Sequence, residues 1–317
     1  MKVYGEINYG GILTHNGVAM NLEYIADSYK HGLNLTKGYI GGGYIGANIW
    51  TVVTTIENST DTWGTSATAS IPALYYGSWM SSHTNGYMLY TSLSNYKMSF
   101  ATENVVATTS RNYGTANSPV SITHGIGYEP DGTGYGTKGF LIANNSTNYD
   151  VLNFASDTWV AKSDANVATQ PAYTQAWFDK LYGWSLGSDG VTRKFPFSSE
   201  TWTSITPTPN YTLTPSYWGK GLPTKDGKSY VHPGGLVAPF MKYMHITDSY
   251  QTNPYNQTLN NDEQSPVMGQ NHGYWAGGYN GVQNAHSDRV EYNTDTVINI
   301  LDAPRALSSG SPMWSGY

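Results

Sequence analysis

A carboxylate between two hydroxyl side chains, followed by an aromatic ring, occurs at several places in this chain. In the stretch from Phe154 to Trp159 the carboxylate is Asp157, and its neighbours are Ser156 and Thr158. An acid that lies beside hydroxyl groups and a ring that can stack on a sugar are what a glycan-active site would use. Acid–base chemistry on a glycan is therefore the first chemistry to consider.

Repetition of this motif changes its interpretation. The acidic positions that recur are Asp27, Asp61, Asp157, Glu200, Asp248 and Asp295, with a weaker match at Glu103, and the Trp residues that follow them are Trp63, Trp159 and Trp202. A catalytic residue would be unique, whereas Asp, Ser and Thr side chains bond to nearby backbone N–H groups in tight turns. We interpret the motif as the turn of a repeated hairpin, with the Trp packed between neighbouring sheets.

The elements around this turn recur in a fixed order. A strand with Gly beside an aromatic residue comes first, then an apolar strand that runs into the turn, and then a Pro. The Gly/aromatic strands include Gly42-Gly43-Tyr44, Gly86-Tyr87 and Gly139-Phe140, and from the second onward they are spaced by roughly 44 to 53 residues, the range of β-propeller blades. Pro cannot donate to a sheet, so it belongs at an edge or between blades.

These features predict an all-β β-propeller that forms a single domain over residues 1–317. We count seven blades, with six as the alternative if the shorter N-terminal unit merges with the last one. The predicted units are approximately 1–38, 39–80, 81–130, 131–177, 178–222, 223–271 and 272–317. We expect N- and C-terminal strands to close the ring in one blade, with 1–7 and 311–317 as the strands, because closure removes exposed sheet edges. Long irregular loops are expected at 108–136 and 251–273.

The order Gly42-Gly43, Ile56, Trp63 and Pro72 resembles a unit of the kelch-type β-propellers. This resemblance covers nearly the whole chain, although the interval from Phe154 to Trp159 is shorter than in a usual kelch unit and the Arg and His that often follow the Pro are mostly missing. In being divergent, free of Cys and rich in Asn, Thr, Gly and Tyr, the chain also resembles the kelch-like virion proteins of tailed bacteriophages, especially marine ones. That resemblance implies a structural protein of a virus particle.

Several propeller chemistries lack their residues. Kelch-type copper oxidases need a Tyr crosslinked to Cys, and the chain has no Cys; a sialidase would require three of only four Arg for its carboxylate clamp. The eight His show no spacing typical of a metal site, and the Gly41 to Gly46 run lacks the Lys-Ser/Thr of a phosphate loop. We therefore predict no catalytic residue, no metal and no cofactor, and we expect the chain not to be an enzyme.

Composition argues against two classes of partner. The net charge is −6, and the 16 Lys and Arg form no cluster that could track a phosphate backbone, so no nucleic acid is expected. No apolar run approaches the roughly 18 residues of a membrane-spanning helix, so no membrane insertion is expected. The first residues lack the apolar core of a secretory signal.

Aromatic residues beside Gly are the one hint of a binding surface. We single out Tyr76, Trp79, Trp218, Tyr274 and Trp275 as a possible ligand or partner surface, with packing between blades as the alternative. The leading hypothesis is a non-enzymatic structural component of a tail, neck, fibre or head surface, located in the virion after assembly in the host cytoplasm and contacting other virion proteins in multiple copies. The alternatives are a propeller that binds a host glycan or receptor at a fibre or cell surface and, third, a glycan-active enzyme.

Overall fold

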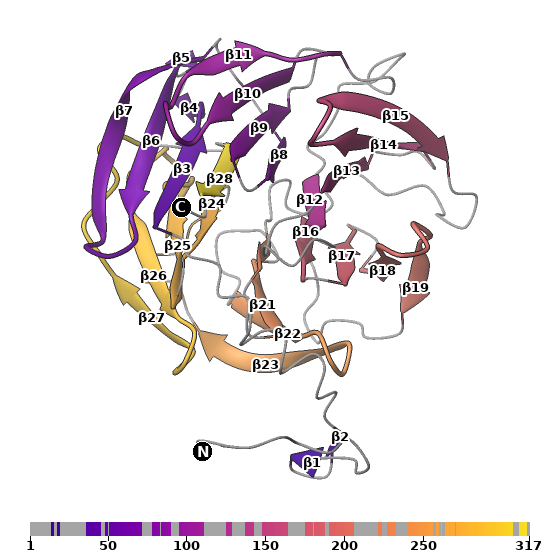
Figure 1. Cartoon of the computed structure of the whole chain (residues 1–317). Coiled ribbons are helices and arrows are strands. Elements are labelled where there is room, and N and C mark those ends of the chain that lie inside the picture. Colours follow the sequence, from indigo (N-terminus) through magenta and orange to yellow (C-terminus); the bar gives the residue numbers. More distant parts are fainter. Residues whose placement is uncertain are drawn as a thin grey trace, which may run out of the picture.

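The fold is a propeller of six four-stranded antiparallel sheets arranged around a central axis (Figure 1). The computed structural model describes residues 14–15, 18–19, 36–45, 48–49, 51–71, 78–82, 84–89, 95–110, 125–128, 137–142, 148–163, 175–179, 181–187, 190–205, 221–223, 227–232, 240–255, 258–259, 261, 264–269, 271–306 and 311–315. These residues form strands, turns and connections, and none of them is helical.

We number the blades in chain order and the strands of each blade from the axis outward. Blade 1 contains β28 (Ser311–Ser315), β3 (Lys37–Gly41), β6 (Val52–Glu57) and β7 (Thr62–Ser70). Blade 2 contains β8 (Ser78–Ser81), β9 (Asn85–Leu89), β10 (Asn95–Ser99) and β11 (Val105–Ala107). Blade 3 contains β12 (Gly125–Tyr128), β13 (Lys138–Ile142), β14 (Asn148–Asn153) and β15 (Thr158–Ser163).

The second half of the ring repeats this arrangement. Blade 4 contains β16 (Gln175–Phe178), β17 (Tyr182–Leu186), β18 (Thr192–Pro196) and β19 (Thr203–Ile205). Blade 5 contains β20 (Gly221–Pro223), β21 (Lys228–Val231), β22 (Phe240–Met244) and β23 (Ser249–Tyr255), and blade 6 contains β24 (Ser265–Met268), β25 (His272–Ala276), β26 (Ser287–Glu291) and β27 (Thr296–Asn299). Two short hairpins form sheets of their own: β1 (Thr14–His15) with β2 (Val18–Ala19), and β4 (Tyr44–Ile45) with β5 (Asn48–Ile49).

The prediction of seven blades was wrong, and the alternative of six is what the structure shows. Each of the six units predicted from residue 39 to the end carries strands two to four of one blade, followed by the innermost strand of the next. The last innermost strand, β28, therefore returns to blade 1 and pairs with β3, with Met313 opposite Tyr39. The ring is closed by this C-terminal strand, as expected for 311–317, whereas residues 1–7 lie outside the described residues.

Two of the innermost strands lie in stretches that were predicted to be irregular loops. Residues 108–136 and 251–273 were expected to be irregular loops, yet they contain β12 and β24, respectively. Both strands are four residues long, and β12 is half Gly, so neither shows the alternation that marks a longer strand. Both segments are strands because they pair with β13 and β25, although their own sequences do not indicate a strand.

The core lies between the blades. Between blades 4 and 5, for example, Trp177 and Trp184 pack with Met241 and Tyr243, and all four side chains are fully buried. Between blades 6 and 1, Val267 and Tyr274 pack with Ile40 and Ile56. Burial of such side chains contributes about 1.5–3 kcal/mol each, so every blade is stabilised by its two neighbours.

Antiparallel order gives the disc two different faces. Strands one and three of each blade end, and strands two and four begin, at one end of the blade, which we call the turn face. Strands two and four end, and strands one and three begin, at the other end, which we call the loop face. The repeated acidic motif forms the strand-three-to-four turns, so all six copies in the ring lie on the turn face.

Candidate functional site

The repeated acidic residues adopt a conformation that non-glycine residues rarely use. Their φ angles are positive, from 46° at Asp248 to 56° at Asp295, and the residues are Asp61, Glu103, Asp157, Glu200, Asp248 and Asp295. The left-handed region costs an L-residue about 1–2 kcal/mol, and Asp tolerates it better than most. Asp27, the remaining predicted member, lies outside the described residues.

Each of these side chains binds the preceding blade, which corrects the expectation that they bond within their own turns. Asp295 of blade 6 accepts hydrogen bonds from Lys228 (2.7 Å), Lys242 (2.6 Å) and the hydroxyl of Tyr230 (2.5 Å), all in blade 5. Burial would raise the pKa of the Asp295 carboxyl, but these hydrogen bonds outweigh it and lower the pKa. The acid is thus held as a carboxylate at the blade interface.

The same contact recurs at the other five interfaces. Glu103 binds Lys37, Asp157 binds Lys97, Glu200 binds Lys138 and Lys162, Asp248 binds Lys194, and Asp61 binds Arg289. Aromatic donors add to five of the six, because Tyr39, Tyr87, Trp184, Tyr230 and Tyr274 donate to the carboxylates of the following blades. These acids fasten blade to blade and are not available as a repeated reactive group.

The choice between Asp and Glu follows the position of the cation. In four blades the residue opposite the strand-two aromatic is Lys97, Lys194, Lys242 or Arg289, and each of these faces an Asp. In blades 1 and 3 that position holds Thr55 or Val151, and a Lys at the start of strand two supplies the charge instead. The acid facing those two Lys is Glu, whose extra methylene group extends its reach.

The predicted aromatic surface divides into buried and undescribed residues. Tyr274 and Trp275 are fully buried, Tyr274 against blade 1 and Trp275 against Phe240 of blade 5, with ring centroids 4.7 Å apart. They therefore offer no ring to a ligand, and the alternative of packing between blades describes them. Tyr76 and Trp218 lie outside the described residues, and Trp79 is in β8 with a side chain that is not described.

The Trp residues of the motif are buried to different degrees. Trp202 is fully buried, with its ring 4.7 Å from that of Phe195. Trp63 and Trp159 are partly buried; Trp63 makes an edge contact with Tyr274 of blade 6 at 6.1 Å. All three rings pack on apolar clusters of the ring rather than standing free.

One arrangement has the connectivity of a hydrolase triad. The hydroxyl of Ser229 lies 2.8 Å from Nε2 of His245, and Nδ1 of His245 lies 3.4 Å from Oδ2 of Asp179. Asp179 is held in place because its Oδ1 accepts the backbone N–H groups of Leu181 and Tyr182, each at 2.7 Å. A nucleophile, a base and an orienting carboxylate are what acyl transfer requires.

Burial and the repeat argue that this triad is structural. Ser229 is 0% exposed, so a substrate cannot reach its hydroxyl in this conformation. Its position holds Gly in the other blades, and the position of His245 holds Phe100, Phe154, Phe197 or Tyr292 in four of them. His245 stacks on Trp184 at 4.4 Å as those rings stack on their own neighbours. Ser229 and His245 thus replace a Gly–aromatic pair by a hydrogen-bonded pair.

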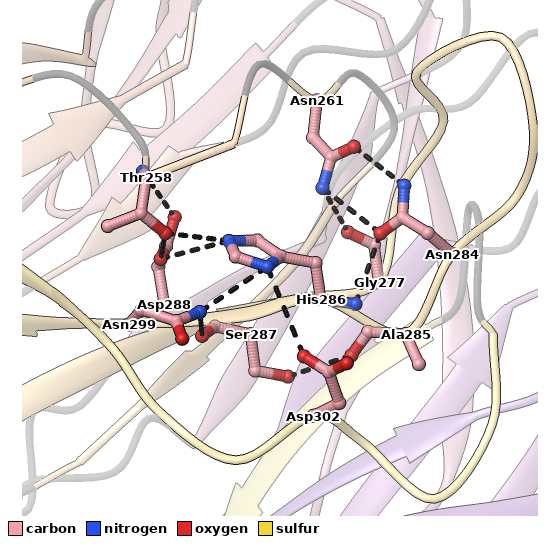
Figure 2. A network of polar contacts seen from close by, with 10 residues as sticks. All are labelled: Thr258, Asn261, Gly277, Asn284, Ala285, His286, Ser287, Asp288, Asn299 and Asp302. Atoms are coloured by element: carbon pink, nitrogen blue, oxygen red, sulfur yellow. Dashed lines mark hydrogen bonds and ion pairs between the residues drawn. The ribbon is translucent and has the colours of Figure 1, made fainter.

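A second polar network lies on the loop face of blade 6 (Figure 2). Asp288, fully buried at the start of β26, accepts from the backbone N–H of Thr258 (3.1 Å) and from its hydroxyl, and it lies 3.2 Å from Nε2 of His286. Asn261 donates to the backbone oxygen of Gly277 (3.1 Å) and exchanges amide hydrogen bonds with Asn284. This network ties the connection from blade 5 to the 277–286 hairpin of blade 6.

The same end of blade 6 exposes apolar side chains. Val282 is 67% and Leu301 79% exposed, and Tyr279 and Ile298 are also at the surface. The two segments that carry them are joined by backbone hydrogen bonds, Ala303 to Ala285 (2.9 Å) and Ile300 to Ser287 (3.0 Å). We call Tyr279, Val282, Ile298 and Leu301 the blade 6 patch. These four are the exposed large apolar side chains among the described residues of blade 6, and we take them as a candidate interaction surface.

The described residues offer no group of three or more His, Asp or Glu arranged to hold a metal ion. No helix long and apolar enough to cross a membrane occurs among them either. No protein-family model matches the chain, and no curated protein is detectably similar to it.

Sequence reasoning missed the cations of the interblade contacts and the triad. An alignment of the six units shows these cations, because each unit has a Lys or Arg either at the start of strand two or opposite the aromatic residue of strand two. It also shows that Ser229 and His245 depart from the repeat together. The loop-face network gave no such signal, since Thr258 and His286 are 28 residues apart in segments without a repeat pattern.

Proposed function

We propose that this chain is a non-enzymatic structural component of a virus particle, and that the propeller acts as a rigid assembly module. The resemblance to kelch-like virion proteins and the Cys-free, weakly charged composition support the particle assignment. The interblade ion pairs support rigidity, because every interface is bridged by at least one cation and one carboxylate.

A binding role is favoured over catalysis because the side chains that could react are engaged in contacts between blades or are buried. The repeated carboxylates are engaged by neighbouring blades, and the one Ser–His–Asp arrangement among the described residues is buried beneath the turn face. What the described surface offers instead is the blade 6 patch, beside a hairpin fixed by the Asn261–Asn284 pair. We propose that this patch contacts other proteins of the particle.

Charge supports a protein partner over a nucleic acid. The chain has 16 Lys and Arg, and eight of them are taken up by the interblade carboxylates: Lys37, Lys97, Lys138, Lys162, Lys194, Lys228, Lys242 and Arg289. Cations paired in this way cannot replace the counterions of a phosphate backbone without breaking the ring contacts.

Gold-labelled antibody against the chain, imaged by negative stain on particles from its source, tests the particle assignment. We expect label at regular positions on intact particles. Absence of label from particles, with the chain recovered as a free monomer, would refute the assignment. A glycan array with the purified chain tests the alternative, because saturable binding to a defined glycan would favour a receptor-binding propeller, and release of a product sugar would instead indicate an enzyme.

A further inference from the structure

The connection from blade 5 into blade 6 is held through two kinds of bond (Figure 2). Asn261 is held by neutral partners, the Asn284 amide and the Gly277 carbonyl. Thr258 is held by a charge, because both its N–H and its hydroxyl donate to the carboxylate of Asp288. Since Asp288 is fully buried, the strength of the second attachment depends on what compensates that charge.

His286 is the group that compensates it. Nε2 of His286 lies 3.2 Å from Asp288 Oδ1 and 2.8 Å from the Thr258 hydroxyl. On the other side of the ring, Nδ1 lies 3.3 Å from the amide nitrogen of Asn299 and 3.9 Å from Oδ1 of Asp302. Among the residues that the structure describes, Asp288 forms no ion pair with Lys or Arg; the adjacent Arg289 is paired with Asp61 and Glu291.

The surroundings of the ring accommodate both protonation states. In the neutral ring, Asn299 donates to Nδ1, so that Nε2 carries the hydrogen and donates toward Asp288 and Thr258. In the charged ring, Nδ1 also carries a hydrogen, so it no longer accepts from the Asn299 amide, and the nearby carboxylate on that side is the exposed Asp302 at 3.9 Å. The imidazolium then lies between two carboxylates, Asp288 from β26 and Asp302 from the connection after β27.

We propose that Thr258, His286 and Asp288 form a proton-controlled latch, in which the charged imidazole holds the blade 5-to-6 connection tightly on the loop face and the neutral imidazole holds it more weakly. The reason is electrostatic, because loss of the proton leaves the buried carboxylate of Asp288 with only neutral donors. The latch would operate in the isolated chain, whatever partner binds this face.

The direction of the pH dependence follows from the pKa of His286. The hydrogen bond to Asp288 raises that pKa, and the charges of Asp288 and Asp302 add to the effect against the opposing influence of burial. A raised pKa in the folded state means that the contribution is complete below the unfolded value of about 6.5 and is lost as pH rises through the folded value. The latch is therefore tight in mild acid and weaker at alkaline pH.

Hydrogen exchange at the Thr258 amide, corrected for the intrinsic pH dependence of exchange, tests the latch. Between about pH 5.5 and pH 8.5 we expect protection in the native chain to fall about five-fold or more, and we expect no such change in His286→Gln. His272→Gln is the matched control, because His272 lies in the same blade near Asp61 on the turn face and its loss should leave the change intact. Equal protection at both pH values in the native chain, or an undiminished change in His286→Gln, would overturn the proposal.

An NMR titration of the His286 ring in the folded chain gives a second readout. We expect a midpoint above about 6.5 in the native chain and a lower midpoint in Asp288→Asn. If Asp288→Asn does not fold, Asp302→Asn, at an exposed position, provides the comparison with a smaller expected decrease. A native midpoint below about 6 would refute the charged latch, because the buried carboxylate would then not be held by an imidazolium at neutral pH.

Discussion

The ammonium group of Lys242 lies 2.6 Å from Oδ2 of Asp295, and the two residues belong to neighbouring blades. This pair represents a contact that is made at every interface of the ring, always by the acid of the strand-three-to-four turn. A sequence motif that resembled a reactive site is thus the fastening between blades.

Removing the charge of Asp295 should destabilise the fold without changing its turn. Asn accepts the left-handed conformation, so Asp295→Asn isolates the loss of charge beside Lys228 and Lys242, which are largely buried. We expect the free energy of unfolding in denaturant to fall by about 1–3 kcal/mol. Asp302→Asn, at an exposed acid, should change it by less than about 0.5 kcal/mol when both variants are measured at about pH 8.5, where the His286 ring beside Asp302 is neutral. Equal effects of the two variants would contradict the fastening role.

Acid should weaken the ring through the same carboxylates. For Glu103, Glu200 and Asp295, burial would raise the pKa, but hydrogen bonds from the partner Lys outweigh it, so each pKa is lowered on folding. Their contribution is therefore present above the unfolded values of about 4 and is lost as pH falls through the lower folded values. When the unfolding free energy is measured from pH 7 downward, the contribution of these three groups should stay constant to about pH 4 and decrease below it. A decline that is complete before about pH 5 would require a different cause.

A shorter acid should be compensated by a cation placed opposite the strand-two aromatic residue. Glu103→Asp alone should weaken the contact with Lys37 across the first interface and cost about 1 kcal/mol of unfolding free energy. Adding Thr55→Lys places a cation where four other blades have one, and it should recover most of that loss. The diagnostic quantity is the coupling energy of the double-mutant cycle; a coupling near zero would show that the Asp/Glu choice has another origin.

Ser229 and His245 should behave as a replaceable packing pair. Ser229→Gly with His245→Phe restores the residues found at these positions in three other blades, so the double variant should fold and retain at least the native stability to within about 1 kcal/mol. Each single change should be more damaging, because it removes the 2.8 Å hydrogen bond while the other polar side chain of the pair stays buried. The folded native chain should also resist a serine-directed fluorophosphonate. Covalent labelling at Ser229 would mean that the triad is accessible and the enzyme alternative must be taken up.

Trp202 and Trp159 differ in exposure, so their replacement by Ala should lower the unfolding free energy by different amounts. Trp202→Ala removes a fully buried ring and should lower the unfolding free energy by about 3–5 kcal/mol. Trp159→Ala removes a half-buried ring at the edge of the Tyr87 and Leu152 cluster and should cost about half as much. Thermal or denaturant unfolding of both variants checks this order, and a reversed order would mean that the two blades are wrongly packed.

The sequence predicted the all-β propeller because the acidic turns and the Gly/aromatic strands repeat with a blade-sized period. It favoured seven blades over the six that the structure shows, since the choice between them depends on how β28 pairs with β3 across nearly the whole chain. It also placed the acids in turns, where the structure has them, but it did not predict their side-chain partners. For Asp157 these partners are Lys97 and Tyr87, which the neighbouring blade supplies.

For the candidate site, local sequence was a weaker guide. Trp275 stands beside Tyr and close to Gly in what resembled a sugar-stacking loop, yet it belongs to β25, the second strand of blade 6, and is buried against Phe240 of blade 5. Val282 and Leu301, which the structure exposes, look like ordinary strand residues in the sequence. Whether a side chain is buried depends on the residues of the neighbouring blade, which are distant in sequence, so the local sequence does not reveal it.

The copy number of blade 6 patch variants in assembled particles tests the central claim most directly. Val282→Ser with Leu301→Ser removes the two most exposed apolar side chains of the patch, and Val106→Ser with Val160→Ser removes two exposed ones on the outer strands of blades 2 and 3. Neither pair should change the unfolding free energy by more than about 1 kcal/mol. Quantitative mass spectrometry of purified particles should then find the patch variant reduced about ten-fold or more relative to the native chain, with the control variant at the native level. Equal incorporation of all three chains would contradict an assembly role for the blade 6 patch, and absence of all three from the particles would contradict the virion assignment itself.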